Sequence, residues 1–198
     1  DDLVNGDYNQ DSDCTTHFGT ADKYGNLVSC TQTAVSSFGS KVISNGLGIL
    51  WNNGMIWFNP KPGSKNSIAP FKRPLVNMAP ILAKKNGKPY MSVGSPGGRK
   101  VNNANTNLSL NILEFGMGPQ EAISTSRSDA SGATTLLDHR INQNVISELK
   151  KMGHKIQMID DMEAWYSFAR PSAIVIDQDN KTIYGGSDSF PVAEARGY

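Results

Sequence analysis

Four residues near the start of the chain, Cys14, Thr15, Thr16 and His17, carry side chains that could act as nucleophiles or bases. They stand between a polar opening stretch and a run rich in β-favouring residues. A threonine hydroxyl needs a base before it can attack a carbonyl, and its own α-amino group can serve once the preceding peptide bond is cut. Cleavage between Cys14 and Thr15 would therefore create a nucleophile. Adjacent threonines are also ordinary strand residues, so the pair alone leaves both interpretations open.

A second candidate is the segment GSPGG, which spans Gly94 to Gly98. Consecutive glycines can present two backbone N–H groups toward one point, because no Cβ blocks the approach of a ligand. Such a pair of donors is what an oxyanion hole requires. The alternative is a simple glycine turn between a strand and a helix. The spacing does not fit the dinucleotide-binding fingerprint, which is wider.

The composition excludes several other functions. A net charge of +1 over 198 residues, with scattered positive side chains, gives no footprint for nucleic acid or an anionic membrane. No apolar run approaches the roughly 20 residues of a membrane span. The two cysteines and three histidines show no metal-ligand spacing, so we expect neither a metal site nor a cofactor. Asp160, Asp161 and Glu163 form an acidic cluster that we expect to be a solvated loop face.

Turn signals predict three β-hairpins, with turns at residues 22–26, 86–87 and 179–180. A further β-favouring run covers residues 46–58 and is interrupted at Asn52-Asn53-Gly54.

Helix signals follow the second hairpin. Leu108, Ile112 and Phe115 have helical spacing before a stop at Gly116, and Pro119 suits the first turn of a short helix. A third helix within residues 142–155 would carry lysines in its last turn and a glycine beyond its end. Strands, helices and strands in this order predict an α+β fold built mainly on antiparallel sheets rather than a βαβ chain.

Six segments, in order and at similar spacing, resemble the small subunit of the γ-glutamyltransferase family, namely TTHFGTADKYGNLVSCTQT, FGS, GILWNNGM, KRPLVNMAP, VGSPGG and the closing YGGSD with GY. These proteins are N-terminal nucleophile (Ntn) hydrolases that cut themselves to release a catalytic threonine. The resemblance implies a four-layer αββα sandwich. It implies that residues 1–14 are the tail of a large subunit or propeptide and that 15–198 form the catalytic small-subunit domain.

The resemblance also implies roles for individual residues. Thr15 would be the nucleophile, released by cleavage after Cys14, and Thr33 would hydrogen-bond to it. Gly97 and Gly98 would be the oxyanion-hole pair. The implied partners are the large subunit of the same precursor, a small amide substrate, and water or an amine acceptor. In this family the large subunit supplies an arginine for the substrate carboxylate. His17 would be structural, since the α-amino group acts as the base.

Three positions depart from the glutamyl-selective pattern. Val35 stands where those members have asparagine, Trp57 (beside Ile56) where they have the aspartate that binds the substrate α-amino group, and Val76-Asn77 where they have two serines. A buried ammonium without its carboxylate would lose several kcal/mol of affinity. We therefore expect an acylase-like specificity, as in the cephalosporin-acylase-like branch of the family. The predicted substrate-binding residues are Trp57, Asn77 and Ser95.

Two alternatives stay open at this point. The chain could belong to a true γ-glutamyl transferase or glutathione hydrolase that holds the α-amino group with other residues. It could also belong to a non-catalytic, uncleaved relative with a binding role. A periplasmic or extracellular location is slightly favoured by the resemblance, but the two cysteines leave the compartment undecided.

Overall fold

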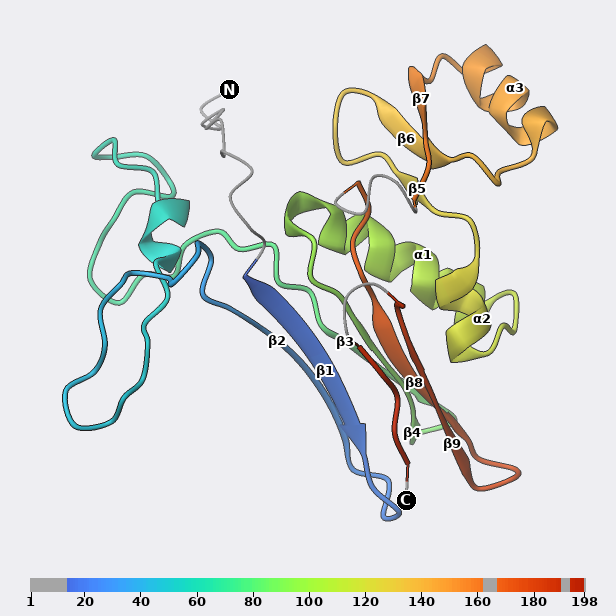
Figure 1. Ribbon diagram of the computed structural model, residues 1–198, viewed down its shortest axis with the longest axis horizontal. Helices are drawn as coiled ribbons and strands as arrows, with labels where there is room; N and C mark the ends of the chain where they lie inside the picture. Colours follow the sequence, from blue (N-terminus) through green and yellow to red (C-terminus); the bar gives the residue numbers. More distant parts are fainter. Residues whose placement is uncertain (1–13, 162–166, 190–192, 198) are drawn as a thin grey trace. The chain divides into compact units, whose positions relative to one another are not determined.

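The computed structural model describes residues 14–161, 167–189 and 193–197 (Figure 1). These form two compact units. The first, called the loop unit, comprises the described residues up to Thr16 together with Gln32–Asn77. The second, called the sheet unit, comprises His17–Thr31 together with the described residues from Met78 onward. In the described part of the chain, no helix has the length and apolar character needed to cross a bilayer. Of the predicted tail at 1–14, only Cys14 lies within the described residues.

A four-stranded antiparallel sheet forms the centre of the sheet unit, with strand order β3-β4-β8-β9. Its strands are β3 (Ile81–Lys85), β4 (Lys88–Gly94), β8 (Ser172–Asp177) and β9 (Thr182–Ser187). Two predicted hairpins build this sheet, and both are confirmed. Asn86 and Gly87 both have positive φ, as the tight turn between two twisted strands demands.

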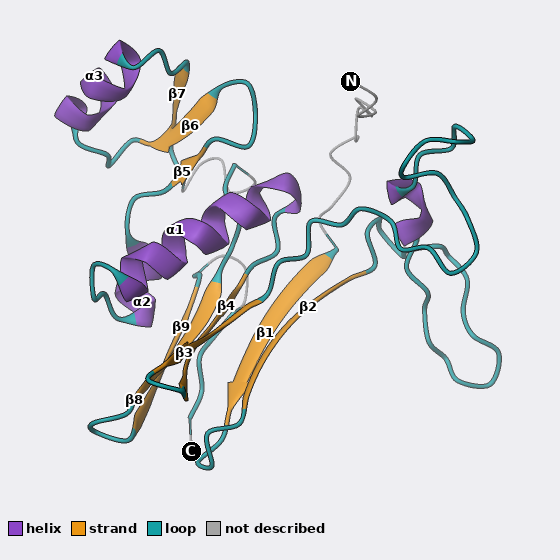
Figure 2. Ribbon diagram, turned by 180° about the vertical axis from the view of Figure 1, so that it is seen from behind, coloured by secondary structure: helices purple, strands orange, loops and turns teal. Residues whose placement is uncertain are grey.

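Two helices, α1 (Val101–Leu113) and α2 (Pro119–Ser124), cover one face of this sheet (Figures 1 and 2). Side chains alternate along β4, so Met91 and Val93 point toward the helices and are fully buried there. Each such side chain contributes about 1.5–3 kcal/mol on burial. Both helices were predicted, but α1 ends before Phe115, which is exposed rather than on the apolar face.

The hairpin of β1 (Thr15–Ala21) and β2 (Leu27–Thr33) was also predicted, and its residues 17–31 pack on the other face of β4. The Ser29 hydroxyl donates to the Val93 carbonyl (3.0 Å), and the Ser92 hydroxyl donates to the Val28 carbonyl (2.9 Å). A Cβ at Gly19 would lie 3.1 Å from the Ser92 hydroxyl oxygen, so small residues permit this close approach. The described sheet unit therefore stacks helices, sheet and hairpin in layers.

A smaller sheet has strand order β5-β6-β7, formed by β5 (Ser128–Asp129), β6 (Thr135–Asp138) and β7 (Ile156–Ile159). The predicted third helix, α3 (Gln143–Lys151), is confirmed and connects β6 to β7. These two strands are parallel, which makes one local βαβ unit. This local unit was not foreseen, because strands of four residues carry too little pattern to be recognised from sequence. The other pairings between the described strands of these two sheets are antiparallel, as expected.

The loop unit contains little regular structure after β2. Its described elements are the 3₁₀ helix η1 (Gly54–Trp57) and two isolated bridges, Ile43 with Leu50 and Asn59 with Ser67. The β-favouring run at 46–58 does not form a strand, so that expectation is wrong. The Asn52 side chain accepts a hydrogen bond from the Gly54 N–H (2.8 Å) and turns the backbone instead.

Many large apolar side chains of the loop unit are more than half exposed, namely Phe38, Val42, Ile43, Leu47, Trp51, Met55, Ile68, Phe71, Leu75 and Val76. Exposed apolar side chains are typical of protein–protein interfaces where they form a contiguous patch.

Candidate active site

The nucleophile corner, as we call residues 14–15 and 33–35, lies where β1 begins and β2 ends. Antiparallel pairing brings the first residue of one strand beside the last residue of the other. The Thr15 hydroxyl donates to the Thr33 hydroxyl at 3.0 Å. The structure thus places together the two threonines that the sequence singled out, although they are 18 positions apart.

The carbonyl of Cys14, which an autocleavage reaction would attack, accepts two hydrogen bonds. One comes from the Thr33 hydroxyl (3.2 Å) and one from the Ala34 N–H (3.1 Å). The Thr33 oxygen also accepts from the Val35 N–H at 2.8 Å. The Thr33 hydroxyl therefore donates its one hydrogen to the Cys14 carbonyl and accepts hydrogen bonds from the Thr15 hydroxyl and the Val35 N–H. Its one donor and both of its acceptor lone pairs are thus used. Two donors on one carbonyl polarise it toward nucleophilic attack.

The backbone after Thr33 turns sharply at Val35, whose φ is 75°. Positive φ is an outlier for a β-branched residue, and such strained residues cluster at functional sites. Asn53 fixes this turn from across the loop unit. Its side-chain oxygen accepts from the Ser36 N–H (3.0 Å), and its backbone N–H donates to the Ala34 carbonyl (3.2 Å). The sequence indicated Asn53 only as a turn residue and missed this role.

The glycine loop, residues 94–98, connects β4 to η2 (Gly98–Lys100) and then to α1 in the sheet unit. Gly97 has φ 144° and Gly98 has φ 59°. A Cβ on Gly97 would lie 2.5 Å from the Cβ of Ala169, so no side chain fits there. The Arg170 N–H donates to the Pro96 carbonyl at 3.0 Å. Gly97 is thus required by sterics and backbone conformation, and the positive φ of Gly98 favours glycine. Gly98 stands at a helix start, where N–H groups are available as donors.

The predicted substrate-binding residues differ in their surroundings. Ser95 is fully buried, and its hydroxyl donates to the Asn105 side chain (2.8 Å), which in turn donates to the Ala79 carbonyl (2.8 Å). Its side chain therefore ties the glycine loop to α1. Trp57 lies in η1 of the loop unit and is half-buried, as is Asn77. Their assignment to substrate binding stays a prediction.

His17 follows the nucleophile corner along β1 and belongs to the sheet unit. Its ring Nδ1 lies 2.8 Å from the Thr31 hydroxyl oxygen, and the ring covers Gly94 so closely that a Cβ there would lie 2.1 Å from Cε1. Burial lowers the pKa of His17 from 6.5 to about 4. The ring is neutral at neutral pH and fills space between hairpin and sheet, in accord with the structural role expected for it.

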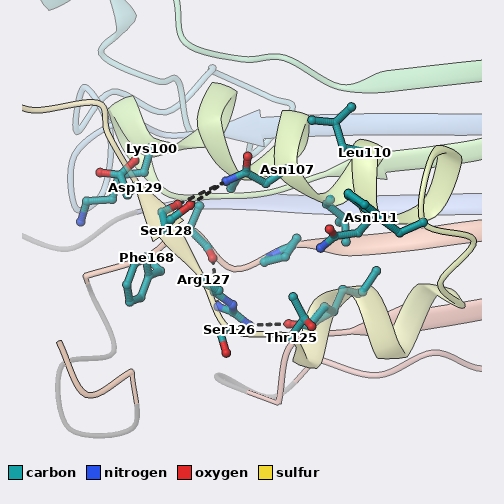
Figure 3. A pocket seen from close by; sticks show the side chains of 17 residues that line it. Lys100, Asn107, Leu110, Asn111, Thr125, Ser126, Arg127, Ser128, Asp129 and Phe168 are labelled. Atoms are coloured by element: carbon teal, nitrogen blue, oxygen red, sulfur yellow. Dashed lines mark hydrogen bonds between the residues drawn. The ribbon is translucent and has the colours of Figure 1, made fainter. Parts of the chain in front are cut away.

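A cavity of about 280 Å³ lies beside α1 in the sheet unit (Figure 3). Leu108, Ile123 and Phe168 supply apolar lining, while Lys100 and Arg127 supply cations. None of the predicted catalytic residues lines it. Across the described residues, no group of three or more histidine, cysteine, aspartate or glutamate side chains is placed to hold a metal ion.

Comparison with known proteins gives consistent results. A family model described as gamma-glutamyltranspeptidase matches residues 3–198. A glutathione hydrolase proenzyme of Bacillus subtilis is 33% identical over 176 residues, covering 88% of this chain and 29% of that protein. An acylase ACY 1 proenzyme of Pseudomonas is 37% identical over 142 residues, covering 72% of this chain and 25% of that protein. The chain thus spans less than a third of the length of these relatives.

Solved structures show the same likeness. An acivicin-inhibited gamma-glutamyltranspeptidase matches with a TM-score of 0.73 and 31% identity, covering 87% of this chain and 97% of that chain. A cephalosporin acylase from Bacillus halodurans matches with a TM-score of 0.74 and 28% identity, covering 87% of this chain and 32% of that chain. The predicted mixed α and β fold with antiparallel sheets, of the Ntn-hydrolase class, is confirmed.

Proposed function

Since the chain belongs to the gamma-glutamyltranspeptidase family, as the sequence motifs predicted, we propose that it is the catalytic part of an autoprocessing amide hydrolase and acyltransferase. The observation that supports this most directly is the hydrogen-bonded set of Thr15, Thr33 and the Cys14 carbonyl. It combines a hydroxyl, its acceptor and a polarised carbonyl at the peptide bond that the reaction would cut. The names of the relatives, hydrolases and acylases made as proenzymes, agree with this chemistry.

Autoprocessing begins when the Thr15 hydroxyl oxygen attacks the Cys14 carbonyl carbon. Thr33 and the Ala34 N–H hold the carbonyl oxygen as negative charge develops on it. The C–N bond then breaks, the proton lost by the hydroxyl passes to the released Thr15 amine, and Cys14 becomes joined to the Thr15 oxygen as an ester. Water hydrolyses this ester, which leaves a Cys14 carboxylate and a free Thr15 with both amine and hydroxyl.

Turnover uses that new N-terminus. The Thr15 amine takes the hydroxyl proton while the oxygen attacks the substrate amide carbonyl. The N–H groups of Gly97 and Gly98 are the proposed donors to the resulting oxyanion, and the loss of one such donor costs about 3–4 kcal/mol. The leaving amine takes the proton from the Thr15 ammonium, and an acyl-enzyme ester stays behind. Water then releases an acid, or an acceptor amine releases a new amide.

Substrate choice rests on three positions. Val35, Trp57 and Asn77 offer no carboxylate to the α-ammonium of a glutamyl donor, so we propose an acyl group that is less polar there. The acylase relative, at 37% identity, supports this choice. A γ-glutamyl donor is the second candidate, because the glutathione hydrolase of Bacillus subtilis matches more of this chain.

The proposed partner is the large subunit of the same precursor. Both relatives named above are proenzymes, and this chain spans less than a third of their length. The exposed apolar side chains of the loop unit are a suitable surface for such a subunit.

Intact mass spectrometry of the full-length precursor tests the proposal. Wild type and Thr16→Ala should yield a fragment that begins at Thr15, whereas Thr15→Ala should stay intact. Thr16 is the matched control because it is the adjacent threonine and is exposed. A wild type that stays uncut would overturn the mechanism and favour a non-catalytic binding role. If it cuts, rates on alkanoyl, aryl-acyl and γ-glutamyl anilides decide between the two donor classes.

A further inference from the structure

Four charged side chains gather behind the glycine loop, from parts of the sequence up to 61 positions apart. They are Arg127, Asp161, Arg170 and Asp188, and we call them the charge cluster. None was recognised from the sequence as functional. Asp161 was expected on a solvated loop face, and that expectation is wrong because the side chain is enclosed by two arginines. Glu163 of the same acidic run lies outside the described residues.

The ion pairs link all four members. Arg127 contacts Asp188 directly and lies 3.6 Å from Asp161. Arg170 lies 2.9 Å from Asp161 and 3.6 Å from Asp188. Each arginine therefore faces both carboxylates, and two positive charges balance two negative ones. The planar guanidinium of an arginine has five N–H donors in a fixed arrangement, so it can contact two carboxylates at once. The ammonium of a lysine is a compact point charge and does not offer this geometry.

Three of the four members are buried, and the Arg127 side chain is 16% exposed. Asp188 is 3% exposed, Asp161 7% and Arg170 9%. Buried ion pairs are weak evidence for stability, because desolvation offsets much of their attraction. What they do supply is a fixed geometry, since a displaced member would leave a buried charge without its counter-ion.

That geometry is transmitted to the glycine loop through the segment 169–171. Arg127 donates to the Ala169 carbonyl (3.2 Å), and the Asp188 N–H donates to the Pro171 carbonyl (3.0 Å). Ala169 in turn occupies the space that a side chain on Gly97 would need, and the backbone N–H of Arg170 donates to the Pro96 carbonyl. The charge cluster thus fixes the segment 169–171 by hydrogen bonds, and this segment contacts the glycine loop.

Arg127 also donates a hydrogen bond to the Ile123 carbonyl near the end of α2, at 3.2 Å. Arg127 also borders the cavity beside α1 (Figure 3). One side chain therefore joins a helix end, the segment 169–171 and a buried carboxylate.

We propose that Arg127 and Asp188 are positioning residues that hold the amides of Gly97 and Gly98 in the orientation needed for the oxyanion. This inference rests on the proposed function, in which those two amides are the oxyanion donors. In this proposal the cluster does not touch the substrate. It acts through the conformation of the glycine loop.

The test compares three variants of the full-length protein. Arg127→Lys keeps the positive charge but loses the planar set of guanidinium donors. Asp188→Asn keeps the shape of the side chain but loses its negative charge. Arg140→Lys is the matched control, because Arg140 also pairs with a buried aspartate, Asp138, and with a backbone carbonyl, but does not contact the segment 169–171. The measurements are kcat and KM on the best anilide donor, the melting temperature, and hydrogen exchange of the amides at 97–100.

Arg127→Lys and Asp188→Asn should each lower kcat by about tenfold or more, with KM changed by less than about threefold. Exchange at 97–100 should become about tenfold faster in both. Arg140→Lys should lower the melting temperature and leave kcat and this exchange unchanged. If the cluster variants melt earlier but match the control in kcat and exchange, the cluster only stabilises the fold and the inference is wrong.

Failure of the proposed function gives a different result. A wild type that neither cuts itself nor acts on any anilide would refute the enzyme mechanism, and with it the oxyanion role of the loop. The exchange measurement would still show whether Arg127 and Asp188 hold the glycine loop in place.

Discussion

The nucleophile corner and the glycine loop are both small pieces of backbone with a proposed catalytic role, but they are held in opposite ways. The corner is fixed by hydroxyl and amide hydrogen bonds among partly exposed residues, centred on Thr33. The glycine loop is fixed by sterics, at Gly97 against Ala169, and by buried charges behind it.

The difference follows from what each region has to do. A nucleophile must give up a proton and form and break a bond to its own chain, so its contacts have to be exchangeable, and single hydrogen bonds of about 1 kcal/mol permit this. Oxyanion donors must stay where they are while charge develops, because rearrangement during the reaction would cost part of their benefit. Steric changes in the glycine loop should therefore destabilise the fold, whereas loss of a hydroxyl in the corner should slow the reaction with little change in stability.

The largest effect is expected for Gly97→Ala. Its Cβ would lie 2.5 Å from the Cβ of Ala169, at a φ that L residues rarely adopt. Overpacking and backbone strain together should cost about 3–5 kcal/mol. We expect the melting temperature to fall by about 10 °C or more.

Gly98→Ala is the control for this prediction, because its Cβ would meet nothing within 4 Å and only the positive φ is unfavourable. It should cost about 1 kcal/mol. Adding Ala169→Gly to Gly97→Ala should recover little of the loss, because the backbone Cα of residue 169 would still lie 2.6 Å from the new Cβ. Equal melting temperatures for the two single variants would show that the loop is not held by sterics.

Next comes Thr33→Ala, which tests the corner. This change removes the acceptor for the Thr15 hydroxyl and one of the two donors to the Cys14 carbonyl. We expect autocleavage to slow about a hundredfold, the effect of losing one oxyanion donor, with little change in melting temperature. Mass spectrometry over a time course measures this rate. Thr33→Ser keeps the hydroxyl and should cut at nearly the wild-type rate; a Thr33→Ala protein that does so as well would contradict the proposed role.

A smaller effect is expected at Val35, the strained residue of the corner. Asparagine adopts positive φ more readily than valine, so Val35→Asn should stabilise the protein by about 1 kcal/mol. The melting temperature should rise by about 2–4 °C. Val42→Asn is the control, since Val42 is an exposed valine of the same unit without positive φ. A gain at both positions, or at neither, would mean that the backbone at Val35 stores no strain.

Sequence alone predicted the features that depend on neighbours in the chain. The three hairpins follow from turn residues such as Asn86-Gly87, and α2 follows from Pro119 at its start. The loop unit was misjudged because its apolar residues follow the β pattern, while Gly46, Gly48 and the Asn52 side chain bend the backbone. The residue types of this segment favour a β-strand, but its glycines and the Asn52 hydrogen bond favour turns, and the turns form.

In the candidate site, too, the sequence predicted some residues and missed those whose role depends on partners far away in the chain. The resemblance pointed to Thr15 and Thr33, and strand pairing brings them together. Arg127 and Asp161 had no local signal, because their burial depends on Arg170 and Asp188, which are distant in sequence. A buried charge is recognised only when its partners are known.

The last prediction concerns pH and His17, whose ring packs on Gly94 of the glycine loop. Burial lowers its pKa to about 4, against 6.5 when unfolded. Between these two values the unfolded chain binds more protons than the folded protein, so stability should fall as the pH drops from 6.5 toward 4 and lose nothing further from this group below that. Denaturant titrations across this window measure the slope.

His17→Gln should flatten the slope in this window, because no group at that position then takes up a proton on unfolding. Thr31→Val is the control, since it removes the hydrogen bond to the ring but leaves the buried imidazole in place, and it should keep the slope. If His17→Gln loses stability on acidification as steeply as wild type does, the slope has another source. A flattened slope would mean that the imidazole is held neutral between hairpin and sheet, which leaves the Thr15 amine as the base of the proposed mechanism.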